Sequence, residues 1–160
     1  MKRLLILFLL MCSGQVLLAQ NIKKLQIDDL VRIIDSSKTP LIVNFWASWC
    51  TPCIHEIPWF ESAVAEYKDK QVKLLLVSLD FKEDYPKNLP AFIKKNNYQS
   101  EVVWLNETNA DTFCPKIDPS WDGAIPVSLF INKTTNYRSF FNRQVTAPQV
   151  KIEIEKMTKP

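Results

Sequence analysis

Residues 41–53 read LIVNFWASWCTPC, an apolar run that leads directly into two cysteines three positions apart. Its first six residues are typical of a β-strand that is buried on both faces of a sheet. Pro52 is tolerated in the first turn of a helix, where its missing N–H costs nothing. The stretch therefore predicts a buried strand followed by a helix over 51–67, with Cys50 at the helix N-terminus.

Strands and helices alternate on both sides of this stretch. Before it, the sequence predicts an edge strand over 22–27 and a helix over 28–36 that is capped by Asp28. After it, the predicted elements are strands over 72–79 and 102–105, helices over 86–96 and 109–117, a hairpin of strands over 126–131 and 137–141, and a closing helix over 147–157. This order predicts an α/β fold with a mixed central sheet flanked by helices.

Cys50 and Cys53 can close a disulfide across the first helical turn, and their positions give them different roles. The unpaired N–H groups and the dipole of the helix N-terminus favour the thiolate of Cys50. Such a position lowers a cysteine pKa from about 8.5 to between roughly 3.5 and 7.5. We therefore expect Cys50 to attack the disulfide of a partner protein and Cys53 to resolve the mixed disulfide.

Residues 43–53, together with Glu56 and Pro58, resemble the TlpA/ResA-like branch of the thioredoxin superfamily. The segment 123–126 reads GAIP and is similar to the cis-proline loop of that superfamily, and the segment 86–117 resembles the central insertion of this branch. The resemblance covers nearly the whole chain after the leader. It implies a thioredoxin fold and a thiol–disulfide oxidoreductase whose redox group is the Cys50–Cys53 disulfide itself, with no further cofactor and no metal.

The resemblance also implies which residues bind the substrate. The peptide bond before Pro126 would be cis, and the backbone of Ile125 would pair with an extended substrate. Trp49 and Pro52 would flank the disulfide and contribute to substrate docking. Three of the five tryptophans are expected to be neighbours of the disulfide, namely Trp46, Trp49 and Trp121. For Trp121, packing at the edge of the core is the alternative.

Glu56 matches the acidic residue that this branch places three positions after the second cysteine. About 300° of helical rotation puts it on nearly the same face as Cys53. Burial there would raise its pKa and allow it to exchange a proton with the Cys53 thiol, whereas the alternative is a solvated carboxylate that stabilises the helix start. Asn44 stands where thioredoxins have a buried Asp, so Glu56 is expected to be the proton acceptor.

The first residues have the order of a secretory signal. Lys2 and Arg3 precede an apolar run over 4–11, and a second short run ends at Ala19, which predicts cleavage after that residue. Lipidation of Cys12 and an uncleaved anchor are the alternatives, although an anchor needs roughly 20 apolar residues. Cleavage leaves one thioredoxin-like domain, residues 20–160, in an exported and periplasmic protein, with membrane association as the alternative.

Three cysteines would remain after cleavage, namely Cys50, Cys53 and Cys114. One close pair and one further cysteine indicate redox or metal chemistry at the pair rather than a set of structural disulfides. Cys114 is expected to be packed in the core, with pairing or glutathionylation as the alternative. The cleaved chain would carry 18 basic and 17 acidic residues, which gives no reason to expect a nucleic-acid partner. We expect a monomer.

Two other functions compete with the oxidoreductase. A copper-binding module could use Cys50 and Cys53 with His55 or Cys114 as a third ligand, although His55 is expected to be an exposed helix residue. A peroxidase of the peroxiredoxin type needs a Pro-x-x-x-Thr-x-x-Cys run, which residues 44–50 do not supply. The preferred prediction is a reductase of disulfides in exported proteins such as apocytochrome c, supplied with electrons by a membrane thiol donor.

Overall fold

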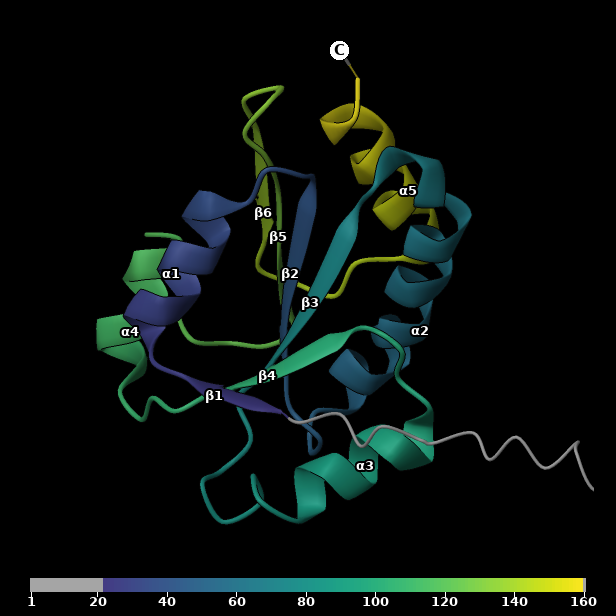
Figure 1. Cartoon of the computed structure of the whole chain (residues 1–160). Coiled ribbons are helices and arrows are strands. Elements are labelled where there is room, and N and C mark those ends of the chain that lie inside the picture. The colour runs from purple at the N-terminus through teal and green to yellow at the C-terminus, as the bar shows by residue number, and fades with distance from the viewer. Residues whose placement is uncertain (1–21, 160) are drawn as a thin grey trace, which may run out of the picture.

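The computed structural model describes residues 22–159 (Figure 1). Signal cleavage after Ala19 and lipidation of Cys12 concern residues outside this range and stay predictions, as does the domain boundary at residue 20. The elements are β1 Lys23–Leu25, α1 Ile27–Ser36, β2 Leu41–Trp46, α2 Thr51–Glu66, the short 3-10 helix Lys68–Lys70, β3 Lys73–Ser78, α3 Asn88–Asn96, β4 Glu101–Leu105, α4 Ala110–Ile117, β5 Val127–Asn132, β6 Tyr137–Phe141 and α5 Ala147–Met157. The predicted α/β fold is confirmed.

The six strands form one mixed sheet in the order β1-β4-β3-β2-β5-β6. Strands β1, β4, β3 and β2 pair in parallel, because helical crossovers connect β2 to β3 and β3 to β4. Strand β5 pairs antiparallel with β2, and the β5–β6 hairpin completes the sheet. The strand that leads into the two cysteines is therefore central, with a paired neighbour on each side.

Helices cover both faces of the sheet and enclose two separate cores. In Figure 1, α1 and α4 lie on one side of the sheet, whereas α2 and α5 lie on the other. Alternate residues of β2 contribute to the two cores: Ile42 and Trp46 pack in the core with α2, α3 and α5, and Val43 and Phe45 pack in the core with α1 and α4. Burial on both faces explains why this strand is a continuous apolar run.

The start of α1 differs from the prediction. Asp28 is not the cap, because the helix already begins at Ile27 and Gln26 is its N-cap residue. The Asp29 carboxylate accepts a hydrogen bond from the backbone N–H of Gln26, and the buried side chain of Ile27 holds the first turn against the second core. Within residues 22–159, no helix is both long enough and apolar enough to span a bilayer.

Candidate active site

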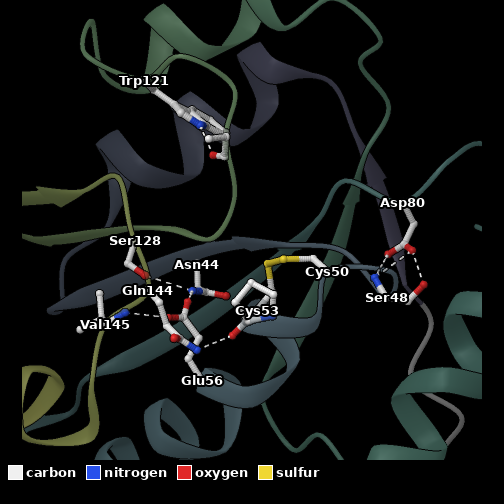
Figure 2. The surroundings of a disulfide bond; sticks show 12 residues. Asn44, Ser48, Cys50, Cys53, Glu56, Asp80, Trp121, Ser128, Gln144 and Val145 are labelled. Carbon is white, nitrogen blue, oxygen red and sulfur yellow. Dashed lines mark hydrogen bonds between the residues drawn. A yellow bond between two sulfur atoms is a disulfide. The ribbon is translucent and has the colours of Figure 1, made fainter.

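The Cys50–Cys53 disulfide lies where β2 leads into α2 (Figure 2). The two Cα atoms are 5.3 Å apart. Cys50 is the N-cap of α2: its N–H donates to the Ala47 carbonyl at 3.0 Å and its carbonyl accepts from the Ile54 N–H at 3.1 Å. Cys50 is 6% exposed and Cys53 is fully buried, so the two cysteines differ in access in the way that their expected roles require.

Glu56 lies one turn beyond Cys53 and is fully buried. Its Oε1 accepts a hydrogen bond from Asn44 Nδ2 at 2.7 Å, and its Oε2 accepts one from the Val145 N–H at 2.8 Å. Burial raises the pKa of Glu56 from 4.5 to about 7, and these two hydrogen bonds oppose the shift only in part. The alternative of a solvated carboxylate at the helix start is therefore wrong.

Two strands and a loop supply the polar groups around Glu56. Asn44 of β2 pairs with Ser128 of β5 in the sheet, and Asn44 Nδ2 also donates to Ser128 Oγ at 3.0 Å. Both side chains are fully buried. Asn44 was expected only as the residue that replaces a buried Asp, and no role was predicted for Ser128 or Val145. The one serine in the apolar run VSLFIN could have indicated a buried polar contact at Ser128. Nothing in the sequence indicated that the Val145 N–H would meet Glu56.

A second polar cluster, centred on Asp80, holds the loop before Cys50. The Ser48 N–H donates to Asp80 Oδ1 at 3.0 Å, and the Ser48 hydroxyl donates to the same oxygen. Ser78 Oγ donates to Asp80 Oδ2 at 2.7 Å, and the Trp104 indole donates to the Asp80 carbonyl at 2.8 Å. These bonds connect the ends of β3 and β4 to the loop between β2 and α2. No motif in the sequence predicted this cluster.

The loop between β6 and α5 contacts the first two turns of α2. Gln144 Nε2 donates to the Pro52 carbonyl at 2.8 Å, in addition to the bond from Val145 to Glu56. In Figure 2 these two residues lie on the side of α2 away from the Asp80 cluster. The start of α2 is therefore held from both sides. The loop before α5, about 90 residues later in the chain, holds one side, and the loop that follows β3 holds the other.

The expected tryptophans occupy three different environments. Trp49 is 54% exposed and stacks on Phe81, which is 61% exposed, with ring centroids 5.8 Å apart. Trp46 is fully buried, and Trp121 is buried against Phe45 in the second core with ring centroids 4.6 Å apart. Trp46 belongs to the same core cluster as Cys50 and Cys53, so it is a buried neighbour of the disulfide. Trp121 takes the alternative of core packing, because it lies in the second core. The exposed Trp49–Phe81 pair is the aromatic surface next to the cysteines.

The Ile125–Pro126 peptide bond is cis, as the resemblance implied. Pro126 is buried and Ile125 is half-buried. Val127, the first residue of β5, pairs with Phe45 near the end of β2, so Pro126 lies at the same end of the sheet as the disulfide. Gly123, which precedes this segment, has φ = +91° and permits the turn. The proposed substrate roles of Trp49, Pro52, Ile125 and Pro126 stay predictions.

Comparison with known proteins agrees with this geometry. Residues 17–137 match the AhpC/TSA family. The chain belongs to this family. Within it, the chain is 26% identical over 137 residues to "Thiol-disulfide oxidoreductase ResA" of Bacillus cereus (85% of this chain, 70% of the relative). It is 44% identical over 50 residues to the protein of the same name from Oceanobacillus iheyensis (31% of this chain, 26% of the relative) and 37% identical over 62 residues to "Sporulation thiol-disulfide oxidoreductase A" of Bacillus subtilis (39% and 38%).

Solved structures of similar shape show the fold. A thioredoxin-related protein of Neisseria meningitidis superposes with a TM-score of 0.65 at 22% identity, covering 78% of this chain and 89% of that one. StoA of Bacillus subtilis superposes with a TM-score of 0.58 at 27% identity, covering 75% and 85%. The thioredoxin fold and the ResA-like resemblance are thereby confirmed. The alignments span 26%, 70% and 38% of the three sequence relatives, so the activity, substrates and partners are treated below as proposals.

His55 and Cys114, the two candidates for a third metal ligand, do not lie together with the cysteine pair in this AhpC/TSA-family chain. His55 is exposed on α2, as expected. Cys114 is unpaired and buried in the second core, on the opposite side of the sheet from Cys53, and burial raises the pKa of its thiol to about 11. Within the described part of the chain, no three or more His, Cys, Asp or Glu side chains are grouped to hold a metal ion.

Proposed function

We propose that this protein is an exported thiol–disulfide oxidoreductase that reduces disulfides in other exported proteins through Cys50 and Cys53. The observation that carries the proposal is the asymmetric cysteine pair, with Cys50 at the N-cap of α2 and Cys53 buried one turn before the carboxyl group of Glu56. The first cysteine can meet a protein substrate, and the second has a proton acceptor on its own helix face.

The reaction starts from the dithiol form of the protein. The Cys50 thiolate attacks one sulfur of the substrate disulfide, the substrate S–S bond breaks, and the other substrate sulfur leaves as a thiolate. Cys53 loses its proton and attacks Cys50 Sγ, which releases the second substrate thiolate and forms the Cys50–Cys53 disulfide. Two electrons thus pass to the substrate, whose two thiolates take up protons. The disulfide form described here is the product of this cycle.

Glu56 suits the proton-transfer step. A general base works best when its pKa lies near the working pH, and burial brings the pKa of Glu56 to about 7. A carboxyl group with a pKa near neutrality can accept the proton of the Cys53 thiol and return it when the protein is reduced again. The carboxyl group would therefore serve both directions of the cycle.

The direction, the compartment and the partners are supported by sequence. The Thr51-Pro52 dipeptide between the cysteines is closer to reducing members of the superfamily than to strong oxidants, and the leader resembles a secretory signal. A reductase in an oxidising compartment needs a dedicated electron source, for which we propose a membrane thiol donor. The ResA-like resemblance suggests the haem-site cysteines of apocytochrome c as a substrate, and we propose that the protein is a periplasmic monomer.

The decisive experiment is the reduction potential of residues 20–160, measured by dithiothreitol or glutathione titration. A value near or below about −270 mV supports a reductase, whereas a value near about −120 mV would mark an oxidant and overturn the proposed direction. Cys114→Ala is the matched control and should leave the potential unchanged, because Cys114 lies across the sheet. Loss of the redox transition in Cys53→Ala would confirm that the couple is Cys50–Cys53.

A further inference from the structure

The side-chain amide of Asn44 is incompletely hydrogen-bonded although it is fully buried. Its nitrogen donates to both Glu56 Oε1 and Ser128 Oγ, but its Oδ1 has no hydrogen-bond partner among residues 22–159. Burying an acceptor without a hydrogen-bond partner is unfavourable, so this oxygen calls for an explanation. Asn44 shares its sheet face with Ile42 and Trp46, the face against which Cys53 packs.

The unpartnered oxygen is turned towards the cysteines. Figure 2 shows the Asn44 nitrogen on the side of Glu56 and Ser128, and the Asn44 oxygen on the side of Cys53. In the disulfide form neither cysteine carries a proton, so neither sulfur can donate a hydrogen bond to this oxygen. Reduction creates a donor, the S–H group of Cys53, on the same side.

Both oxygens of Glu56 face hydrogen-bond donors. Oε1 faces Asn44 Nδ2 and Oε2 faces the Val145 N–H, an arrangement suited to an ionised carboxylate, which only accepts. A proton added to either oxygen would meet a donor. The Val145 N–H is fixed by the backbone, whereas the Asn44 amide can turn about its terminal torsion and exchange its oxygen and nitrogen. Ser128 permits the exchange, because a hydroxyl can both accept and donate.

We propose that Asn44 is a positioning residue whose amide turns over with the ionisation of Glu56 and so couples Glu56 to Cys53. When Glu56 is ionised, Asn44 Nδ2 holds the carboxylate and Oδ1 accepts from the Cys53 thiol. When Glu56 takes the proton, Oδ1 accepts from its O–H group and Nδ2 faces the Cys53 thiolate. The inference rests on the proposed function. It adds that Asn44 supplies the appropriate donor and acceptor to Glu56 and Cys53 both before and after the proton moves between them.

Neutral groups surround this coupling. The Glu56 carboxyl group meets the Asn44 amide from β2 and the Val145 N–H from the loop before α5. Ser128 of β5 reaches it only through Asn44, and Cys53 lies three positions earlier on the same helix. Burial raises the pKa of Glu56 to about 7, the hydrogen bonds from Val145 and Asn44 oppose this rise, and no charged side chain contributes to it. A change of the thiol-release rate with pH near neutrality therefore reflects the titration of Glu56 and of the cysteines.

The two steps of the cycle can be timed separately with 5,5′-dithiobis(2-nitrobenzoate). The reduced protein releases a first thionitrobenzoate when Cys50 attacks the reagent and a second when Cys53 attacks the mixed disulfide. In Asn44→Leu, which has nearly the same shape but no polar group, we expect the second release to slow by about tenfold. This is less than the roughly 10²–10⁴ that general acid–base catalysis supplies, because Glu56 itself remains in place. The first release should stay within about twofold. The pH midpoint of the second release should move upward from about 7, because the hydrogen bond from Asn44 lowers the pKa of Glu56.

Asn132→Leu is the matched control. Asn132 is a second buried asparagine, in β5, and its side chain donates to the Met157 carbonyl at the end of α5. The variant should lose stability in the same way as Asn44→Leu without changing either release rate. If Asn132→Leu slows the second release as much as Asn44→Leu, the effect is a general loss of packing and the proposal is overturned.

Nuclear magnetic resonance tests the rotation directly, without relying on either variant. In the wild type, the Asn44 side-chain amide resonances should titrate with the same midpoint as the Glu56 carboxyl carbon, in the reduced protein and in the disulfide form. Amide resonances that stay constant while Glu56 titrates would rule out the rotation. If the wild type shows no second release at all, the proposed function fails; if it shows one that Asn44→Leu leaves unchanged, only the role of Asn44 fails.

Discussion

At the scale of single residues, Glu56 is the group whose chemistry the fold changes most. The side chain is fully buried, and its pKa rises from 4.5 to about 7 because the charged form loses its hydration. Such a shift means that ionising the Glu56 carboxyl group lowers the free energy of unfolding by roughly 3 kcal/mol. A purely structural residue at this position would be apolar, so the cost is consistent with a role in proton transfer.

Glu56→Gln tests this cost through the pH dependence of stability. Because the pKa is higher in the folded than in the unfolded state, the native protein binds more protons between pH 4.5 and about 7, and its free energy of unfolding should fall as the pH rises through that range. Glu56→Gln should lack this decline and be more stable than the wild type at pH 8 by roughly 1–3 kcal/mol. Urea unfolding of the disulfide form at pH 4.5 and pH 8 measures both. A wild-type stability that is flat over this range would contradict the assignment.

Trp49 and Phe81 are the exposed residues most suited to contact a protein substrate. Their stacked rings lie at the surface beside Cys50, where they make no contribution to the core. We expect Trp49→Ala to raise the KM for a protein disulfide by about tenfold, on the scale of roughly 1–2 kcal/mol for a lost aromatic contact, and to leave the reaction with a small aromatic disulfide within about threefold. Steady-state kinetics with both substrates measures the difference. Trp59→Ala, at a half-buried position in the middle of α2, is the comparison, and equal effects of the two variants would argue against a docking role for Trp49.

At the scale of elements, the loops around α2 hold the reactive turn in place. The loop after β3 binds Ser48 through Asp80, and the loop before α5 binds Pro52 and Glu56 through Gln144 and Val145. None of these contacts is local in sequence. The segment over 118–126 completes the site by carrying the cis peptide bond before Pro126 to the same end of the sheet.

Gly123→Ala tests the conformation of that segment. Gly123 has φ = +91°, which L-amino acids rarely adopt, and an added Cβ would lie 3.3 Å from the Ala110 Cβ. We expect a loss of about 1–3 kcal/mol in the free energy of unfolding. Ala124→Ser, at the exposed neighbouring position, should change stability by less than about 0.5 kcal/mol. Equal stability of Gly123→Ala and the wild type in urea unfolding would show that the turn adapts.

At the scale of the whole molecule, the sheet separates the chemistry from half of the core. Cys53 and Phe60 belong to the core with α2, α3 and α5, whereas Leu30 and Cys114 belong to the core with α1 and α4. The second core therefore stabilises the fold from the face of the sheet opposite Cys53, and Ile125 packs against both cores.

Leu30→Ala tests this separation. The side chain is fully buried in the second core, so we expect the free energy of unfolding to fall by about 2–5 kcal/mol. The reduction potential and the pH dependence of the second thiol release should stay as in the wild type. Ile33→Ala, on the exposed side of the same helix, controls for loss of helix propensity and should cost less than about 1 kcal/mol. A changed potential in Leu30→Ala would show that the two cores are coupled.

Much of the fold and part of the site could be predicted from the chain alone. The strand over 41–46 and the helix that follows it depend on local patterns of apolar residues and proline, so their positions were predicted within a residue. The cap of α1 was predicted wrongly, because tertiary burial of Ile27 draws the helix start forward. The sequence left two surroundings open for Trp121, and the structure selects the second core, because side-chain burial depends on which elements pack together.

The cysteine pair, its place at a helix start, and the alternation that specifies a mixed sheet could all be inferred from short segments, since each is encoded by residues close together in the chain. The environment of Glu56, in contrast, depends on contacts between distant segments. Its partners Asn44 and Val145 lie 12 and 89 positions away, and its pKa follows from burial between a helix, a sheet and a loop. Hydration is lost only when distant segments meet, so chemistry that depends on desolvation cannot be read from any one segment.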